Sequence, residues 1–166
     1  MWRYGSGGPA LRERRQGQRH YLRHKRMLDV VLSLLALMVL SPLLLAIGLL
    51  VAVDDPCGSP IFCQERVGKG GRRFWMYKFR TMCVDAETRL EELSLHNEMS
   101  GPTFKMREDP RITRVGRILR RTSLDELPQL VNVLRGEMSL VGPRPPLPRE
   151  VAQYTPYEWQ RLSITP

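Results

Sequence analysis

Cysteine and histidine are scarce in this sequence of 166 residues, which contains three of each. No two cysteines form a C-x-x-C pair and the histidines are scattered; the six residues are Cys57, Cys63, Cys83, His20, His24 and His96. Zinc sites and disulfide frameworks need such residues at short, regular spacing. The scarcity argues against both and fits a reducing compartment.

Aromatic residues are also few, at 7% of the chain, although the net charge is +9. The basic excess is concentrated in residues 1–26, which contain eight Lys or Arg and a single acidic residue. Binding of single-stranded nucleic acids needs aromatic residues among the basic ones, and this arm has only Trp2, Tyr4 and Tyr21. We therefore expect no nucleic-acid partner, a chain that is disordered before about Tyr21, and attraction to anionic lipid head groups.

Charge is absent from residues 30–53, a run of 24 residues that is long enough to cross the ~30 Å hydrocarbon core of a bilayer. Ser41 and Pro42 lie at its middle, where the proline removes a backbone hydrogen bond and predicts a kink. Each half is then about 18 Å long, too short to cross alone. Basic residues flank both ends, which favours a cytoplasmic position for both. A straight transmembrane helix and a re-entrant helix both remain open from the residues alone.

Glycines separate two β-like runs in the segment after the apolar run. Two β-like runs, residues 60–67 and 73–82, are separated by Gly68-Lys69-Gly70-Gly71, a pattern typical of a β-hairpin. These glycines satisfy turn geometry; alternatively, they would let backbone amides and Lys69 approach a phosphate. Residues 85–99 are predicted to form a helix.

Arginine dominates residues 107–121 at helical spacing, which predicts a basic amphipathic helix suited to a membrane surface. A further helix is expected over residues 124–135. Ser123 and Glu126 match a capping box, Pro128 falls in the first turn, and Gly136 is placed as a stop.

Two adjacent acids, Asp125 and Glu126, stand at the expected start of that helix. In a structural interpretation, Glu126 caps the helix and Asp125 meets the positive end of its dipole. In a chemical one, a carboxylate kept ionised there serves as a nucleophile or a magnesium ligand. A stiff proline-rich loop then offers Arg144, and arginines suit a diphosphate substrate.

Several long stretches, in this order, resemble the monotopic phosphoglycosyl transferases, or bacterial sugar transferases. The resemblance covers residues 25–166. It rests on KRMLD at 25–29, Ser41-Pro42, QERVG at 64–68, YKFRTM at 77–82, DPRITRVGRILRRTSLDELPQL at 109–130 and NVLRGEMSLVGPRP at 132–145.

The resemblance implies a phosphoglycosyl transferase that moves a sugar 1-phosphate from a UDP-sugar to undecaprenyl phosphate, the first membrane step of exopolysaccharide, O-antigen or glycoconjugate assembly. Asp125 would be the nucleophile and Glu126 its partner acid, and the two would bind Mg²⁺. The residues facing the substrate phosphates would be Lys78, Arg80, Arg111, Arg114 and Arg144.

The resemblance also implies an organisation: a basic arm (residues 1–26), a re-entrant membrane helix (27–53) broken at Ser41-Pro42, and a catalytic domain (54–166) on the cytoplasmic face of the bacterial inner membrane. The expected fold is α/β, mostly helical with a small β-hairpin. Family members continue beyond the segment that resembles residues 163–166, so the C-terminal end of the catalytic domain is expected to be missing. The alternative is a truncated, catalytically silent membrane-peripheral protein. The residues name neither the sugar, the glycan pathway nor the oligomeric state.

Overall fold

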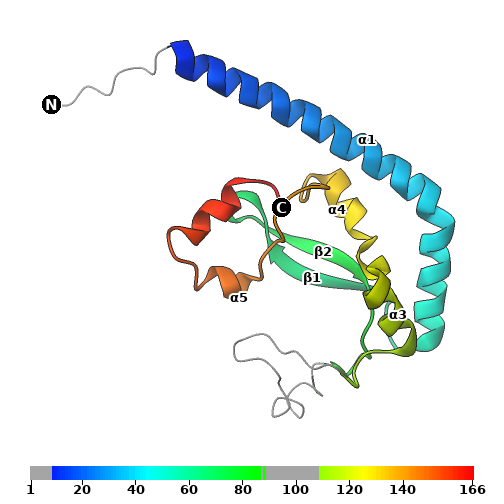
Figure 1. The fold of residues 1–166 in the computed structure, drawn as a ribbon. Helices are drawn as coiled ribbons and strands as arrows, with labels where there is room; N and C mark the ends of the chain where they lie inside the picture. Colours follow the sequence, from blue (N-terminus) through cyan, green and yellow to red (C-terminus); the bar gives the residue numbers. More distant parts are fainter. Residues whose placement is uncertain (1–8, 87, 89–108) are drawn as a thin grey trace.

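The computed structural model describes residues 9–86, 88 and 109–166, and most of the helix expected over residues 85–99 lies outside them. Its longest element is helix α1, Pro9–Asp54, which arches along one side of the other elements (Figure 1). The structure describes a helix from Pro9 onward in the segment expected to be disordered before about Tyr21, and the disorder of this arm stays a prediction. Arginine, glutamine and leucine are good helix formers, and extending an existing helix is far easier than nucleating a new one.

The apolar run lies in the second half of α1, and within the described residues α1 is the one helix long and apolar enough to cross a membrane. Pro42 lies inside it without ending the helix, and Figure 1 shows α1 changing direction in its cyan part. Pro42 has no N–H for the carbonyl of Met38, and the Ser41 hydroxyl donates to that carbonyl at 2.8 Å instead. The break expected at Ser41-Pro42 is therefore a bend within a continuous helix. The Met38 carbonyl that the proline leaves without a partner is bonded by the neighbouring Ser41 hydroxyl.

The predicted hairpin is confirmed. Strands β1 (Ile61–Val67) and β2 (Arg73–Phe79) pair antiparallel, with Ile61 opposite Phe79 and Val67 opposite Arg73. The connecting turn, η1 (Lys69–Gly71), contains Gly70 at φ +67° and Gly71 at φ +80°. Residues with a side chain rarely adopt such angles, so the turn geometry itself requires these glycines.

A side chain closes the outer edge of β2. Asn132, on helix α4 (Gln129–Arg135), is fully buried; its amide donates to the Trp75 carbonyl at 2.7 Å and accepts from the Tyr77 N–H at 3.1 Å. The amide thus takes the place of a third strand. It also donates to the Glu137 carboxylate at 2.7 Å, so the strand, the helix and the following loop meet at one residue.

Helix α3 (Arg114–Thr122) is shorter than the basic helix expected over residues 107–121. Residues 109–113 form a turn instead, in which Ile112 forms a β-bridge with Met82. The Thr113 side chain accepts from the Gly116 N–H at 3.0 Å and so caps a helix that begins at Arg114 rather than at residue 107.

Ser123 ends α3 in the left-handed conformation, with φ +59°. The helix expected over residues 124–135 is therefore divided into a 3-10 turn, η3 (Leu124–Glu126), and α4. The capping-box interpretation is wrong, because Ser123 makes no side-chain cap bond and Pro128 occupies the N-cap of α4. Gly136 ends α4 at φ +81°, as predicted.

Apolar side chains hold these elements together in three clusters. The first packs α1 against the end of β2 and α3, through Ile47, Val51, Phe79 and Leu119. The second joins β2 to α4, through Phe74, Met76, Val133 and Met138. The third places α5 (Pro148–Val151) and η4 (Glu158–Ser163) against β1, through Val67, Val151 and Leu162. This mostly helical fold with one two-stranded sheet agrees with the predicted fold class.

Asn132→Ala should lower the free energy of unfolding by about 3 kcal/mol, because buried partners on β2 lose their hydrogen bonds and gain no water. Unfolding midpoints in detergent micelles measure the loss. Gln153→Ala, at an exposed position, is the control and should leave the midpoint unchanged. A midpoint that does not move in Asn132→Ala would show that the amide does not support the strand edge.

Gly116→Ala should destabilise the protein by about 2–3 kcal/mol through overpacking. A Cβ there would lie 2.2 Å from the Thr81 carbonyl oxygen, so α3 would have to move away from the chain that follows β2. Gly48→Ala is the matched helical control, since its Cβ would meet no atom closer than 3.9 Å. Equal unfolding midpoints for the two variants would contradict the close approach.

Candidate active site

Asp125 and Glu126 lie in η3, the turn between α3 and α4, which contacts β2. Lys78 of β2 donates to Glu126 Oε1 at 2.8 Å. The Lys78 side chain is 18% exposed, whereas that of Glu126 is half exposed. The structure thus brings together three residues that the sequence analysis assigned to one site from two separate stretches of chain.

The two carboxyl groups are shifted in opposite directions. Burial raises the pKa of Asp125, an effect that the charge of Lys78 opposes and that of Glu126 reinforces. The hydrogen bond from Lys78 lowers the pKa of Glu126, and the charge of Arg144 acts in the same direction. At Asp125, burial outweighs the favourable charges. A partly desolvated carboxylate keeps more of its basicity and nucleophilicity.

A hollow of about 450 Å³ is lined by Glu126 of the acid pair. Part of its wall is polar and consists of Lys78, Ser123, Glu126, Gln129 and Arg144. The rest is apolar and consists mainly of Leu127, Leu130, Val133, Met138 and Leu140. The hollow is therefore suited to an anionic group that carries an apolar extension.

Arg144 reaches this wall from a loop that Arg66 holds. The Arg66 guanidinium is buried and donates to the Pro145 carbonyl at 3.1 Å and to Gln64 Oε1 at 2.6 Å. Burial lowers the pKa of Arg66, and the charge of Arg144 lowers it further. Sequence reasoning gave Arg66 no role in the site; it counted only among the basic residues that flank the apolar run and within the QERVG stretch.

Arg80 and Arg111, both expected to face phosphates, are buried in other contacts. Arg80 donates to the carbonyls of Asp55 and Gly58 and pairs with the Asp55 carboxylate at 3.2 Å. Arg111 forms a two-point ion pair with Asp109, at 2.9 and 2.6 Å. Because these bonds engage both guanidinium groups, the structure does not bring them to the acid pair. Arg80 instead binds the chain at the end of α1, and Arg111 stabilises the turn before α3.

Three other basic residues differ in their relation to the pair. Arg114 is exposed on the first turn of α3 and forms no hydrogen bond or ion pair with Asp125 or Glu126 in the described part of the chain. Arg120, which sequence reasoning gave no separate role, lies on the last turn of α3, and its charge lowers the pKa of Asp125. Lys69 lines a different hollow of about 660 Å³, together with Arg72, Arg73 and Arg135. Its contact with a phosphate stays a prediction.

Asp125 and Glu126 are the candidate magnesium ligands. Among residues 9–86, 88 and 109–166, no three His, Cys, Asp or Glu side chains are grouped as a metal cluster. Mg²⁺ is commonly held by one or two carboxylates together with substrate phosphates and water. Two carboxylates beside a cationic hollow fit that open kind of site rather than a closed protein cage.

Lys78→Met should raise the pKa of both acids, because a neutral side chain of similar length removes the attraction that favours the two carboxylates. Titration of ¹³C-labelled carboxyl resonances measures both shifts. Lys69→Met, at the exposed hairpin turn, should change neither pKa. Unchanged pKa values in Lys78→Met would contradict the ion pair seen here.

Comparison with known proteins identifies the family. A family model described as bacterial sugar transferase matches residues 20–166. Galactosyl transferase CpsE of Streptococcus agalactiae serotype III (strain NEM316) is 46% identical over 142 residues, which are 86% of this chain and 31% of that protein. The putative undecaprenyl-phosphate N-acetylgalactosaminyl 1-phosphate transferase of Bacillus subtilis (strain 168) is 44% identical over 128 residues, 77% of this chain and 65% of that protein.

The undecaprenyl-phosphate galactose phosphotransferase of Salmonella typhimurium is 45% identical over 134 residues, 78% of this chain and 28% of that protein. The chain thus spans less than two thirds of the length of each of these three relatives. The family match nevertheless covers every described residue from His20 onward, including the acid pair and the hollow beside it. This chain belongs to the bacterial sugar transferase family.

Proposed function

We propose that this chain transfers a sugar 1-phosphate from a UDP-sugar to undecaprenyl phosphate, through a phosphosugar ester of Asp125. The observation that carries the proposal is the partly buried Asp125, which adjoins Glu126 in the chain; Glu126 and its ion-pair partner Lys78 line a hollow together with Arg144. Relatives named as undecaprenyl-phosphate sugar transferases support the reaction class.

In the first step, a carboxylate oxygen of Asp125 attacks the β-phosphorus of the UDP-sugar. The bond between that phosphorus and the bridging oxygen breaks, and UMP leaves with the electron pair. Lys78 and Arg144 supply positive charge where the phosphate oxygens become more negative. The raised pKa of Asp125 is consistent with a nucleophile that is not fully hydrated.

In the second step, an oxygen of the lipid phosphate attacks the same phosphorus and releases the Asp125 carboxylate. Glu126 would accept any proton that the lipid phosphate carries, because it lines the hollow as an ionised carboxylate. The apolar wall of the hollow gives the lipid an adjacent surface. Both half-reactions thus use one nucleophile and one set of cationic residues.

Magnesium would be held by Asp125 and Glu126 together with phosphate oxygens of the substrate. When bound, it would neutralise charge on the diphosphate and orient it for in-line displacement.

We further propose that α1 is a re-entrant anchor on the cytoplasmic face of the bacterial inner membrane. The Arg26 guanidinium donates to the carbonyls of Val133 and Leu134 at the end of α4, and Asp54 accepts from the Val115 N–H at 3.0 Å. Both ends of the apolar run are thus tied to the same domain. Between them, apolar side chains are exposed, among them Val39 at 76% and Leu45 at 67%. A bend at Pro42 and two ends on one side support entry and exit through a single face.

The test is UMP release from a panel of UDP-sugars by the protein in lipid nanodiscs, with Mg²⁺ and undecaprenyl phosphate. Asp125→Asn should lower the rate about a thousandfold or more, as loss of a nucleophile does elsewhere. Without the lipid acceptor, the unsubstituted protein should release one UMP per molecule in a burst, since the phosphosugar stays on Asp125.

Glu65→Gln is the control, because that acid pairs with Arg73 on the hairpin and should leave the rate unchanged. Undiminished release by Asp125→Asn would overturn the covalent mechanism. Absence of release from every UDP-sugar would favour a catalytically silent protein in which the acid pair only shapes the turn between α3 and α4.

A further inference from the structure

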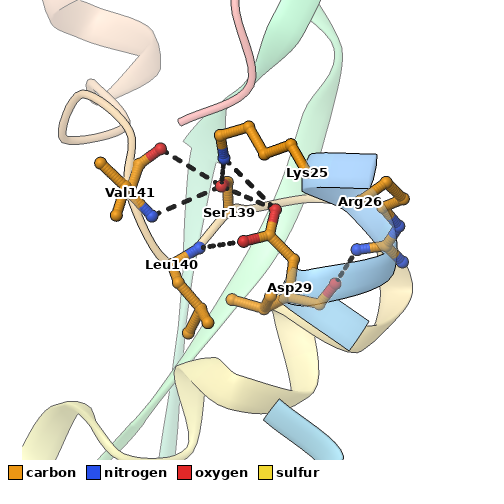
Figure 2. Close-up of polar contacts among 7 residues, drawn as sticks. Lys25, Arg26, Asp29, Ser139, Leu140 and Val141 are labelled. Carbon is orange, nitrogen blue, oxygen red and sulfur yellow. Dashed lines mark hydrogen bonds and ion pairs between the residues drawn. The ribbon is translucent and has the colours of Figure 1, made fainter. Parts of the chain in front are cut away.

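A buried polar cluster joins the start of the apolar helix to the loop beside the active site (Figure 2). Asp29 of α1 is 7% exposed; its carboxylate accepts from the Ser139 hydroxyl at 2.8 Å and from the Leu140 N–H at 3.3 Å. Lys25, one turn earlier, lies 3.3 Å from Asp29 and also donates to the Ser139 hydroxyl. Ser139 itself is 8% exposed. The membrane helix therefore holds this loop by both a side chain and a backbone amide.

The segment held in this way forms one wall of the hollow at the acid pair. Ser139, Leu140, Gly142 and Arg144 all line it, together with Lys78 and Glu126. Just beyond Arg144, the Pro145 carbonyl is bound by Arg66. Arg144 thus lies between two fixed points of the backbone, one provided by α1 and one by β1.

Stability alone does not account for a buried carboxylate at this place. Removing charges from water offsets most of what an ion pair contributes, so buried pairs are weak evidence for stability and better attested as devices that fix one arrangement. Arg26 and the apolar cluster around Ile47 and Val51 already hold α1 to the domain. What Asp29 adds is a fixed position for the loop, through its bonds with Ser139 and Leu140.

We propose that Asp29 and Ser139 are positioning residues, which fix the loop so that Arg144 faces the substrate phosphate. The inference rests on the proposed phosphosugar transfer. It makes the first polar turn of the membrane helix a part of the active-site architecture, and it predicts that Asp29 acts through Arg144. A misplacement of about 1 Å in a charged group is enough to lower a rate about 100-fold.

A double-mutant cycle tests this dependence. Asp29→Ala and Arg144→Ala should each lower kcat/KM for UMP release, by about 100-fold for Asp29→Ala. The double variant should be no slower than Arg144→Ala, because misplacing the loop costs no further rate once the Arg144 guanidinium is absent. Ser139→Ala should give the same non-additive pattern with a smaller single effect. Asp29→Asn keeps an acceptor for the Leu140 N–H and should restore part of the rate.

Val151→Ala is the matched control, since it removes buried apolar atoms in the cluster around α5 and leaves the loop untouched. The fold-reductions in kcat/KM caused by Val151→Ala and by Arg144→Ala should multiply in the double variant. If Asp29→Ala multiplies in the same way, or if Asp29→Ala leaves the rate unchanged, the positioning role is overturned. Should Asp29→Ala fail to fold, the cycle of Ser139→Ala with Arg144→Ala decides the question.

Hydrogen exchange separates this inference from the proposed function, because it needs no substrate. Asp29→Ala should speed amide exchange in a peptide spanning residues 138–144, whereas Val151→Ala should not. Unchanged exchange overturns the inference whether or not the protein is active. Absence of turnover in the unsubstituted protein counts against the proposed function instead.

Discussion

The rest of the structure depends on the polar contacts that hold both ends of the apolar helix segment to one small domain. Backbone groups at the ends of helices have no partner within the helix. Arg26 satisfies carbonyls at the end of α4, and Asp54 satisfies an amide at the start of α3. The turn with Asp125 lies between these two helices. The apolar helix segment and the turn with the acid pair are therefore parts of a single arrangement.

Much of the fold could be predicted from local pattern. The glycine-rich turn, the alternating strands, the apolar run and the stop at Gly136 depend on neighbouring residues only, and all are present. The conformation of Ser123 could not be read in the same way. A serine followed three residues later by glutamate predicts the start of a helix, whereas here the same serine ends the previous one. Whether Ser123 ends one helix or begins the next depends on how α3 packs.

The site was predictable in part for the same reason. Asp125 and Glu126 are adjacent in sequence, but the lysine that pairs with Glu126 is 48 positions away. Arginines were the least predictable: Arg80 and Arg144 belong to equally suggestive stretches, yet one is buried against Asp55 and the other lines the hollow. The sequence does not distinguish an arginine that bonds to backbone carbonyls from one that lines a hollow. The raised pKa of Asp125 likewise comes from burial, which only the packing determines.

The fully buried Asn132 has a consequence for how copies of this domain can meet. An unpaired strand edge normally offers its N–H and C=O groups to a strand from another molecule. The Trp75 carbonyl and the Tyr77 N–H are already bonded to the Asn132 amide, and on the opposite strand the Val67 N–H donates to the Pro146 carbonyl at 3.0 Å. Strand addition is blocked at these positions. A second copy of the domain would meet these positions through side chains rather than through a shared sheet.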